Sequence, residues 1–453
     1  MSTKHTNSSM LVLFARYPER GVGKRRIAKD LGDPETYLLS KHLYINGWFD
    51  LLRWPGPTAV ATTSEEPLDE STPFKVNRLD RFLLQEDGNL GERIKKVEQE
   101  LREEHFGPLI FIGSDAPELT NSHLAATRKL LKEYDVVLGP AADGGVTLMA
   151  VKESWPPLHD LPWGTDQLCD SLKRRCEAYD LDVGFISDSY DTDDCYDLLR
   201  LRNSLAEDAR PDRKSLHHFL SQLFPTVGVV IPARNDHLEL ARLIEHLQQL
   251  TIDNIVVVDS TFDPLTAQRC RKHAVQYTHG GTSRGERMDI GAKLIEDDII
   301  WFLHADARPD KSAADEIRLH IKRGHSGGWF RFRFDSTPHP LKKALEVCIN
   351  WRAKHGIPYG DQGLFVRRKT YKKTCGISHQ PLFEEVQLVK ELRKRNRLGM
   401  PFKALDMTLG VSDRRWQADG WIKRTLHNRW LALQYIFGAD PDDLAAKYRG
   451  NKK

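Results

Sequence analysis

Two apolar runs that each end in an aspartate place the strongest constraint on how this chain can fold. Residues Ile299–Pro309 read IIWFLHADARP, and residues Leu109–Pro117 read LIFIGSDAP. Short apolar runs bounded by turn residues are typical of buried strands. In nucleotide-binding α/β folds, turns at the carboxyl ends of central strands hold metal and phosphate. Because the pattern occurs in both halves, it predicts two related domains, each built to hold a nucleotide-linked substrate.

Length and composition narrow the class of protein further. A chain of 453 residues is too long for a typical single core, so we expect two domains. Its 67 basic and 64 acidic residues leave a net charge of +3, which does not indicate a dedicated nucleic-acid binder. The six cysteines form no C-x-x-C pair, so we expect no zinc site and no disulfide framework. This cysteine usage is typical of a reducing, cytoplasmic environment.

Membrane attachment is expected to be peripheral at most. The N-terminal segment lacks the apolar core of a signal peptide, and no apolar run is long enough to span a bilayer. The Trp- and Arg-rich stretch Arg414–Trp430 leaves two interpretations open. It fits an amphipathic packing helix, which we expect, or a segment that touches anionic lipid.

Strand and helix patterns alternate along both halves, which predicts an α/β fold with two mostly parallel sheets flanked by helices. In the first half we expect strands over residues 10–15, 58–62, 109–112 and 135–138, and helices over residues 90–104 and 122–133. The pattern restarts with strands over residues 227–231, 254–258 and 298–303. We therefore expect a first domain over residues 1–204, a helical linker over 205–224 and a second domain over 225–453.

Polar residues follow three strands of the second half, at Arg234-Asn235, Asp259 and Asp306. A carboxylate at a strand end can accept hydrogen bonds from a nucleobase or ribose. Another can hold a divalent ion that bridges two phosphates. Each of these residues alone fits an ordinary turn or cap, so the prediction depends on the ordered set.

Two later motifs leave alternatives open. Glu384 and Glu385 follow a turn and precede a helical run. They fit catalytic carboxylates, or acids that are favoured at a helix N-terminus. Arg415 and Trp416 put a cation beside an indole, which fits a ligand contact or a surface arginine over a packed tryptophan.

With these motifs the second half resembles a family 2 glycosyltransferase of the GT-A fold, over nearly all of residues 225–453. Within that superfamily it is similar to the branch called radical-SAM/selenodomain-associated transferase 2, also described as arsenosugar-biosynthesis glycosyltransferases. The stretches that carry the resemblance are FLHADARP, WFRFRFD, GIPYGDQGLFVRR, PLFEEVQL and RRW. The resemblance implies transfer of a sugar from a nucleotide-sugar donor to a small-molecule or glycan acceptor, with inversion of configuration.

The resemblance also implies roles for single residues. Asp306 would bind Mg²⁺ or Mn²⁺, and Glu385, or its neighbour Glu384, would be the general base. The residues implied for binding donor or acceptor are Asn235, Asp259, Arg284, Asp361, Gln362, Arg415 and Trp416. The chain departs from the family at His304, which replaces the first aspartate of the D-x-D motif. Further departures occur at Arg287, Asp289 and Ser412.

A glycine-bearing basic loop, Gly21–Arg26, follows the first strand of the other half. Such a loop lets backbone N–H groups approach phosphate, although a basic surface loop is the alternative for this stretch alone. With the stretches GNLGER, GSDAP, GPAADGG, PWGT and YDTD, residues 10–201 resemble radical-SAM/selenodomain-associated transferase 1. That branch is akin to 2-phospholactate guanylyltransferases. The resemblance implies phosphate contacts at Lys24 and Arg26, a metal shared by Asp115 and Asp193, and a substrate border at Asp143, Gly144 and Gly145.

Three functional hypotheses follow from these resemblances. We expect a fused bifunctional enzyme, in which a nucleotidyltransferase-like domain accompanies the glycosyltransferase. The alternative is a nucleotide-binding regulatory or scaffold protein with degenerate transferase sites, and the loss of a carboxylate at His304 motivates it. A third hypothesis is synthesis of surface polysaccharide at a membrane, which the lack of a spanning segment disfavours.

Overall fold

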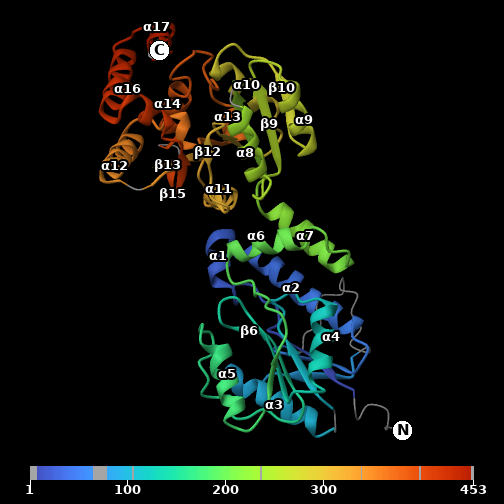
Figure 1. Cartoon of the computed structure of the whole chain (residues 1–453). Coiled ribbons are helices and arrows are strands. Elements are labelled where there is room, and N and C mark those ends of the chain that lie inside the picture. Colours follow the sequence, from blue (N-terminus) through green and yellow to red (C-terminus); the bar gives the residue numbers. More distant parts are fainter. Residues whose placement is uncertain are drawn as a thin grey trace. The chain divides into compact units, whose positions relative to one another are not determined.

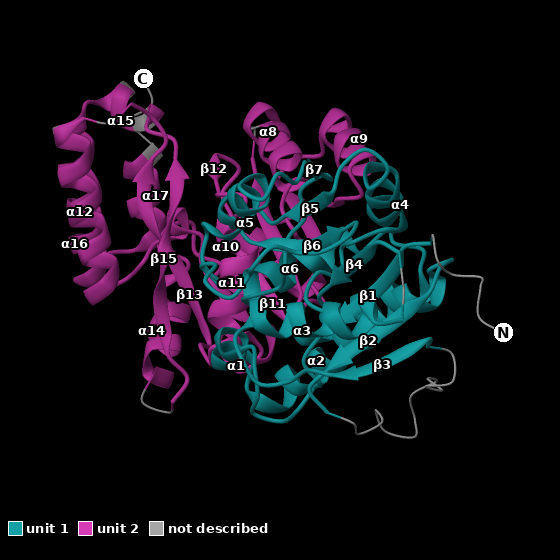
Figure 2. Cartoon of the chain, turned by 90° about the horizontal axis from the view of Figure 1, so that it is seen from below, with its two compact units in different colours: residues 1–223 teal, residues 224–453 magenta. Residues whose placement is uncertain are grey.

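The chain divides into two compact units, residues 1–223 and residues 224–453 (Figures 1 and 2). The computed structural model describes residues 8–64, 79–104, 107–234, 237–337, 339–396 and 399–449. Each unit has its own sheet and its own core.

Unit 1 is built on a mixed sheet of seven strands in the order β3-β2-β1-β4-β6-β5-β7. The strands are β1 (Met10–Phe14), β2 (Thr58–Thr62), β3 (Arg81–Leu84), β4 (Leu109–Ile112), β5 (Val136–Pro140), β6 (Val146–Val151) and β7 (Val183–Phe185). Strand β6 runs antiparallel to both neighbours, and the other described pairings in this sheet are parallel.

Helices cover both faces of this sheet. They are α1 (Arg25–Leu31), α2 (Asp33–Arg53), α3 (Leu90–Arg102), α4 (Asn121–Leu130), α5 (Leu168–Glu177), α6 (Cys195–Ser204) and α7 (Pro211–Leu223). Successive side chains of a strand point to opposite faces, so β1 contributes to two cores. Met10 and Val12 pack in the cluster that contains residues of α3 and α5. Leu11 and Leu13 pack in the cluster that contains residues of α2 and α4.

The segment that we expected to be a linker contains α7, which packs against α2 and α6 within unit 1. The side chain of Arg213 is fully buried there. Its guanidinium lies 2.6 Å from a carboxylate oxygen of Asp50 and 2.9 Å from one of Asp212. A buried charge needs partners of this kind, so these contacts hold α7 on α2.

Unit 2 repeats the same strand order with one added strand, β10-β9-β8-β11-β14-β13-β15-β12. The strands are β8 (Val227–Ala233), β9 (Asn254–Asp259), β10 (Gln276–His279), β11 (Ile299–Phe302), β12 (Ala307–Arg308), β13 (Gly327–Phe334), β14 (Phe365–Arg367) and β15 (Phe402–Val411). Strand β14 occupies the place of β6 and is likewise antiparallel to both neighbours. The two units therefore share one topology.

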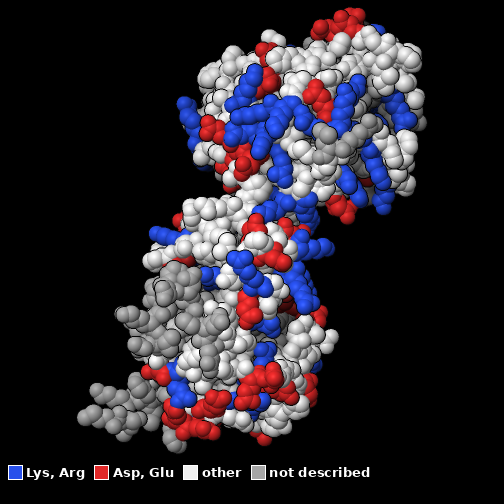
Figure 3. Space-filling view, turned by 180° about the vertical axis from the view of Figure 1, so that it is seen from behind, with Lys and Arg blue, Asp and Glu red and all other residues white. Residues whose placement is uncertain are grey.

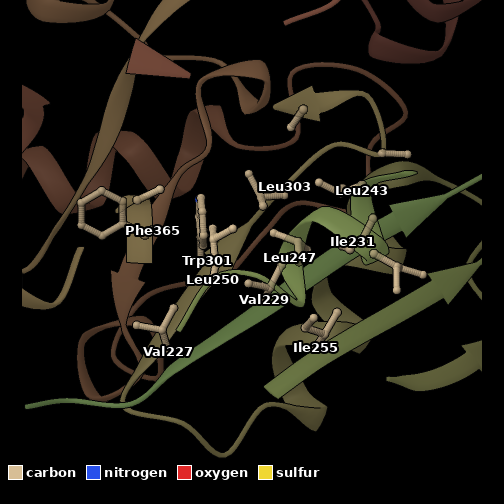
Figure 4. Packing of buried hydrophobic residues seen from close by; sticks show 14 of the residues in the cluster. Val227, Val229, Ile231, Leu243, Leu247, Leu250, Ile255, Trp301, Leu303 and Phe365 are labelled. Atoms are coloured by element: carbon tan, nitrogen blue, oxygen red, sulfur yellow. The ribbon is translucent and has the colours of Figure 1, made fainter. Parts of the chain in front are cut away.

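The core of unit 2 follows the same alternation. Val229 and Ile231 of β8 pack with Leu243 and Leu247 of α8 and with Trp301 of β11 (Figure 4). The helices of this unit are α8 (His237–Leu247), α9 (Pro264–Lys272), α10 (Arg284–Leu294), α11 (Ala313–Lys322), α12 (Pro340–His355), α13 (Arg368–Tyr371), α14 (Val386–Arg395), α15 (Arg414–Asp419), α16 (Trp421–Ile436) and α17 (Pro441–Arg449). A short 3₁₀ turn spans Gly360–Gln362.

The predicted fold class is confirmed, because both units are mostly parallel mixed sheets flanked by helices. Within the described residues, no helix has the length and apolar character that a bilayer-spanning segment requires.

Candidate active site

In unit 2 the predicted site residues gather at the carboxyl ends of the parallel strands. Asp259 ends β9 and is buried. One of its carboxylate oxygens accepts from the backbone N–H of Thr261 at 3.3 Å, and the other accepts from the hydroxyl of Tyr277 at 3.3 Å. These bonds orient the carboxylate and leave lone pairs for a ligand. Asn235 lies outside the described residues.

Arg284 connects two parts of this site from the first turn of α10. Its Nε forms an ion pair with Glu384, and its Nη2 lies 4.0 Å from Oε2 of Glu385. Its Nη1 is 3.1 Å from Nε2 of His304. His304 therefore contacts the arginine, which faces both glutamates.

The backbone permits this close assembly at two points. A Cβ on Gly285 would lie 1.9 Å from the carbonyl oxygen of Ser378 and 2.9 Å from Cβ of Glu384, so only glycine fits there. Phe383 has a φ of 61°, in the left-handed region that non-glycine residues rarely adopt. Such strain persists where the surroundings impose it, and here it immediately precedes the two glutamates.

Glu385 is fixed at one oxygen and unbonded at the other. Its Oε1 accepts from the backbone N–H of Gly360 at 2.7 Å. Its Oε2 is buried and has no hydrogen-bond partner among the described residues. Burial, followed by the charge of Glu384, raises the pKa of Glu385 to about 7, although Arg284 acts in the opposite direction. This carboxylate can therefore take or release a proton near neutral pH.

Asp361 and Asp306 form a second acidic feature. Burial raises the pKa of Asp361, the cations Arg352 and Arg284 lower it, and the charge of Asp306 raises it again. Oδ1 of Asp361 and Oε1 of its neighbour Gln362 are buried without a hydrogen-bond partner among the described residues. Carboxylate and amide oxygens with free lone pairs are the ligands that Mg²⁺ and Ca²⁺ prefer, and Mn²⁺ takes similar ones. Asp361 and Gln362 therefore offer oxygens of the kind that a divalent cation takes, whereas the group of three carboxylates found close together among the described residues lies in unit 1.

Two further arginines, Arg287 and Arg234, belong to the surroundings of Arg284. Arg287 is buried, and its Nη1 donates to the carbonyl oxygen of Gly281 at 3.1 Å. Burial lowers the pKa of Arg287, and the nearby charges of Arg234 and Arg284 lower it further. Three guanidinium groups close together suit a diphosphate. Sequence reasoning treated Arg287 only as a departure from the family, so this contribution was missed.

The predicted Arg415-Trp416 pair lies on α15. Trp416 packs in an aromatic cluster, with ring centroids 5.1 Å from Phe334 and 6.5 Å from Trp421. The side chain of Arg415 is outside the described part of the structure. The indole therefore has a packing role that β13 and α16 define.

In unit 1 the basic loop meets the predicted acids. Lys24 has a φ of 40°, and its Nζ donates to the carbonyl oxygen of Thr192 at 2.9 Å. The same Nζ is 3.6 Å from Asp115, and Nη1 of Arg26 is 3.2 Å from Asp193. The four side chains that the resemblance assigned to phosphate and metal thus lie together.

The carboxylates form a group that could hold a cation. Ligand atoms of Asp143, Asp191 and Asp193 all lie within 4.8 Å of one another. Burial raises the pKa of Asp191 to about 6, and the charges of Asp193, Asp143 and Asp115 raise it in turn. Asp191 received no role from the sequence, and its position two residues before Asp193 was the available signal.

The glycine pair shapes the edge of this group. The backbone N–H of Gly145 donates to Oδ1 of Asp143 at 3.0 Å. Gly144 has a φ of 88°, and a Cβ there would lie 2.0 Å from the carbonyl oxygen of Asp166. Both glycines therefore allow the turn that positions Asp143.

Comparisons with known proteins give a partial family match and remote structural similarity. Residues 53–165 match a family described as "Uncharacterized protein conserved in bacteria (DUF2064)". A protein from Desulfovibrio desulfuricans G20, provisionally described as a nucleotide-diphospho-sugar transferase, is 23% identical, covers 48% of this chain and 98% of its own, and has a TM-score of 0.42. No curated protein matches.

Two further solved structures are similar at lower identity. Glucosyl-3-phosphoglycerate synthase from Mycobacterium tuberculosis is 15% identical over 48% of this chain and 81% of its own, with a TM-score of 0.35. Mannosyl-3-phosphoglycerate synthase from Rubrobacter xylanophilus is 15% identical over 49% of this chain and 73% of its own, with a TM-score of 0.34.

Proposed function

We propose that unit 2 transfers a sugar from a nucleotide-sugar donor to an acceptor hydroxyl, with Glu385 as the general base. The observation that carries this proposal is how the Glu385 carboxylate is bonded and buried. One oxygen is held by Gly360 at 2.7 Å, the other is buried without a hydrogen bond among the described residues, and the pKa is raised. A carboxylate in this state is suited to take a proton in the transition state.

The remaining site residues suit the donor. In this proposal Asp259 accepts hydrogen bonds from the nucleoside, and Arg284 and Arg287 neutralise the diphosphate. Asp306 and Asp361 would hold Mg²⁺ or Mn²⁺, with Gln362 beside them. When bound, such an ion stabilises the negative charge of a departing diphosphate.

The reaction we propose is a single displacement. Glu385 takes the proton of the acceptor hydroxyl as that oxygen bonds to the anomeric carbon. The bond from the anomeric carbon to the diphosphate oxygen breaks, and a nucleoside diphosphate leaves. Attack opposite the leaving group inverts the configuration at that carbon. Glu384 keeps its ion pair with Arg284 and so supports the arginine instead of acting as base.

For unit 1 we propose a nucleotidyltransferase-like site, which would make the chain a bifunctional fusion in the arsenosugar-associated branch. In this proposal Lys24 and Arg26 bind phosphates, and Asp143, Asp191 and Asp193 hold the cation. Support comes from the closeness of the three carboxylates and from the pairing of Lys24 with Asp115 and of Arg26 with Asp193. This assignment predicts pyrophosphate release when the chain meets a nucleoside triphosphate and a matching phosphorylated substrate.

Donor binding tests the proposal for unit 2. Thermal unfolding of the full chain would be followed with a panel of nucleotide-sugars in the presence and absence of Mn²⁺. A ligand that binds only the folded state raises the unfolding temperature with its concentration. We expect a cation-dependent rise for at least one donor and its loss in Asp259→Asn. No response to any donor, or an equal response in Asp259→Asn, would count against this site.

A further inference from the structure

Helices α12 and α16 of unit 2 each expose an apolar stripe. On α12 the exposed apolar side chains include Leu341, Val347 and Trp351, of which Trp351 is 66% exposed. On α16 and its C-cap they are Leu426, Trp430, Leu433, Ile436 and Phe437. Trp430 is 60% exposed and Phe437 is 87% exposed. On α16 the spacings of three and four residues put the set on one helix face, and on α12 Val347 and Trp351 are four residues apart on one face. We call these eight side chains the outer surface.

The opposite faces of the same helices belong to the core. Leu345 and Ile349 of α12 pack against Phe332 and Phe334, as does Trp421 at the start of α16. Figures 1 and 2 place both helices at the same end of unit 2, beside β13 and β15. We expected the stretch Arg414–Trp430 to pack against the rest of the domain, and the inner faces of the helices do so. The outer surface takes no part in that packing and needs a separate explanation.

The exposed lysine and arginine side chains of α12 and α16 have no exposed acid on the same helices. The exposed charged side chains of the two helices are Lys343, Lys354, Lys423 and Arg429. The acid of α12, Glu346, is partly buried and accepts from the backbone N–H of Phe334 at 2.8 Å, and α16 contains no acid. Figure 3 shows many basic side chains beside uncharged surface on the rear face of unit 2, with acidic side chains among them. Acidic side chains follow beyond Phe437, from Asp440 onward.

We propose that the outer surface docks unit 2 onto an anionic membrane surface. Helices with aromatic and aliphatic side chains flanked by lysine and arginine bind at the boundary between headgroups and acyl chains. Tryptophan suits that boundary because it joins an apolar ring to a polar N–H. The basic residues gain from anionic lipid. A symmetric pairing of two copies would bring the same cations face to face without exposed acids from these helices to match them.

Helix α16, which carries part of the outer surface, also packs against the loop that precedes Glu384 and Glu385. The partly buried Tyr435 of α16 packs against Phe383 with ring centroids 4.7 Å apart, and its hydroxyl accepts from Nε2 of Gln380 at 3.1 Å. Phe383 directly precedes Glu384 and Glu385. A membrane held against α16 would therefore support the helix that packs on the catalytic loop. The inference concerns lipid binding and does not depend on the proposed transfer reaction.

Sedimentation of the full chain with vesicles tests the proposal. We expect binding to vesicles of phosphatidylcholine with phosphatidylserine, weak binding to phosphatidylcholine alone, and release as salt is raised. Replacing Trp430 and Phe437 together by serine should lower the partition coefficient by on the order of tenfold or more. The matched control replaces Leu238 and Leu265, which are exposed on α8 and α9, by serine and should bind as the wild type does.

A charge pair gives a second test that leaves the apolar side chains intact. Lys423→Glu with Arg429→Glu should weaken binding to anionic vesicles, whereas Arg271→Glu with Lys272→Glu on α9 should not. Three outcomes overturn the proposal: a wild-type chain that stays in the supernatant, equal losses in the control variants, or light scattering that shows a dimer which the Trp430 and Phe437 variant dissociates. The last outcome would mean that a second copy covers the outer surface.

Discussion

The backbone N–H of Gly360 donates a hydrogen bond of 2.7 Å to Oε1 of Glu385. The bond orients the carboxylate, and Oε2 has no hydrogen-bond partner in the described structure. Arg284, 4.0 Å from Oε2, compensates part of the buried charge. A general base needs one oxygen that fixes its orientation and another that is available to take a proton, and Glu385 has both.

Replacing Glu385 by glutamine should abolish most turnover while donor binding remains. Glutamine keeps the shape and an oxygen for the Gly360 N–H, but it cannot take a proton. We expect kcat to fall by roughly 10²- to 10⁴-fold. Release of nucleoside diphosphate measures turnover, and titration calorimetry measures donor affinity. Glu391→Gln on α14 is the control. A loss of donor affinity as large as the loss of kcat would assign Glu385 to binding instead.

Turnover should fall as the pH is lowered through about 7. Burial, then the charge of Glu384, raises the pKa of Glu385 to about 7, and the base works only when it is deprotonated. Well below that pH, kcat/KM should drop about tenfold per pH unit. The pH profile of kcat/KM on the wild-type chain measures this. A profile that stays flat from about pH 5 to 9 would contradict a proton transfer by this carboxyl group.

Gly285→Ala should lower turnover without unfolding the chain. The added Cβ would lie 1.9 Å from the carbonyl oxygen of Ser378 and 2.9 Å from Cβ of Glu384, so the loop before the two glutamates must shift. A displacement of about 1 Å at a catalytic group can cost on the order of 100-fold in rate. Rate and circular dichroism of the same preparation distinguish the outcomes. Wild-type kcat in a folded variant would mean that this close approach is not needed.

In unit 1, Asp191→Asn should weaken Mn²⁺ binding by roughly tenfold or more, because the number of ligand charges sets affinity. Burial and three neighbouring carboxylates raise the pKa of Asp191 to about 6, so wild-type affinity should increase as the pH rises through that value. Titration calorimetry measures both effects. Asp188→Asn, at an exposed aspartate of the same segment, is the control. Equal affinities in the two variants would remove Asp191 from the site.

Arg213→Ala should destabilise unit 1 by about 3–5 kcal/mol, because it removes a fully buried guanidinium from Asp50 and Asp212 and leaves Arg53 as the partner that they still share. Denaturant unfolding measures the change in the free energy of unfolding. Lys214→Ala, one residue along on the exposed face of α7, should change it by less than about 0.5 kcal/mol. Similar losses in the two variants would show that the buried pairing contributes little.

Much of the fold could be predicted from local sequence, and the parts that could not be predicted depend on distant partners. Strands β2 and β4 were predicted with their observed ends, and β1 to within one residue, because short apolar runs with turns at their ends specify them. Helix α2 was missed. Its buried face includes the polar side chains Asn46 and Asp50, both of which bond to the distant Arg213 of α7.

The candidate site, like the fold, could be predicted from the sequence only in part. Motifs and resemblance named Arg284 and Glu384, although their contact joins residues 100 positions apart. They did not show that Glu384 is engaged by the arginine while Glu385 is held by a backbone N–H, because that distinction depends on the 3₁₀ turn at Gly360. Arg287 belongs to the site because of how α10 packs, and Asp191 because other carboxylates lie beside it. Neither relationship can be read from spacing in the sequence.

The central claim, sugar transfer by unit 2 with Glu385 as base, is tested most directly by the product of one reaction. A donor identified by thermal shift would be incubated with Mn²⁺ and an acceptor panel, and the anomeric configuration of the product read by NMR. We predict nucleoside diphosphate release and a product of inverted configuration with the wild-type chain, and neither with Glu385→Gln. Retained configuration, or release that Glu385→Gln matches, would contradict the account.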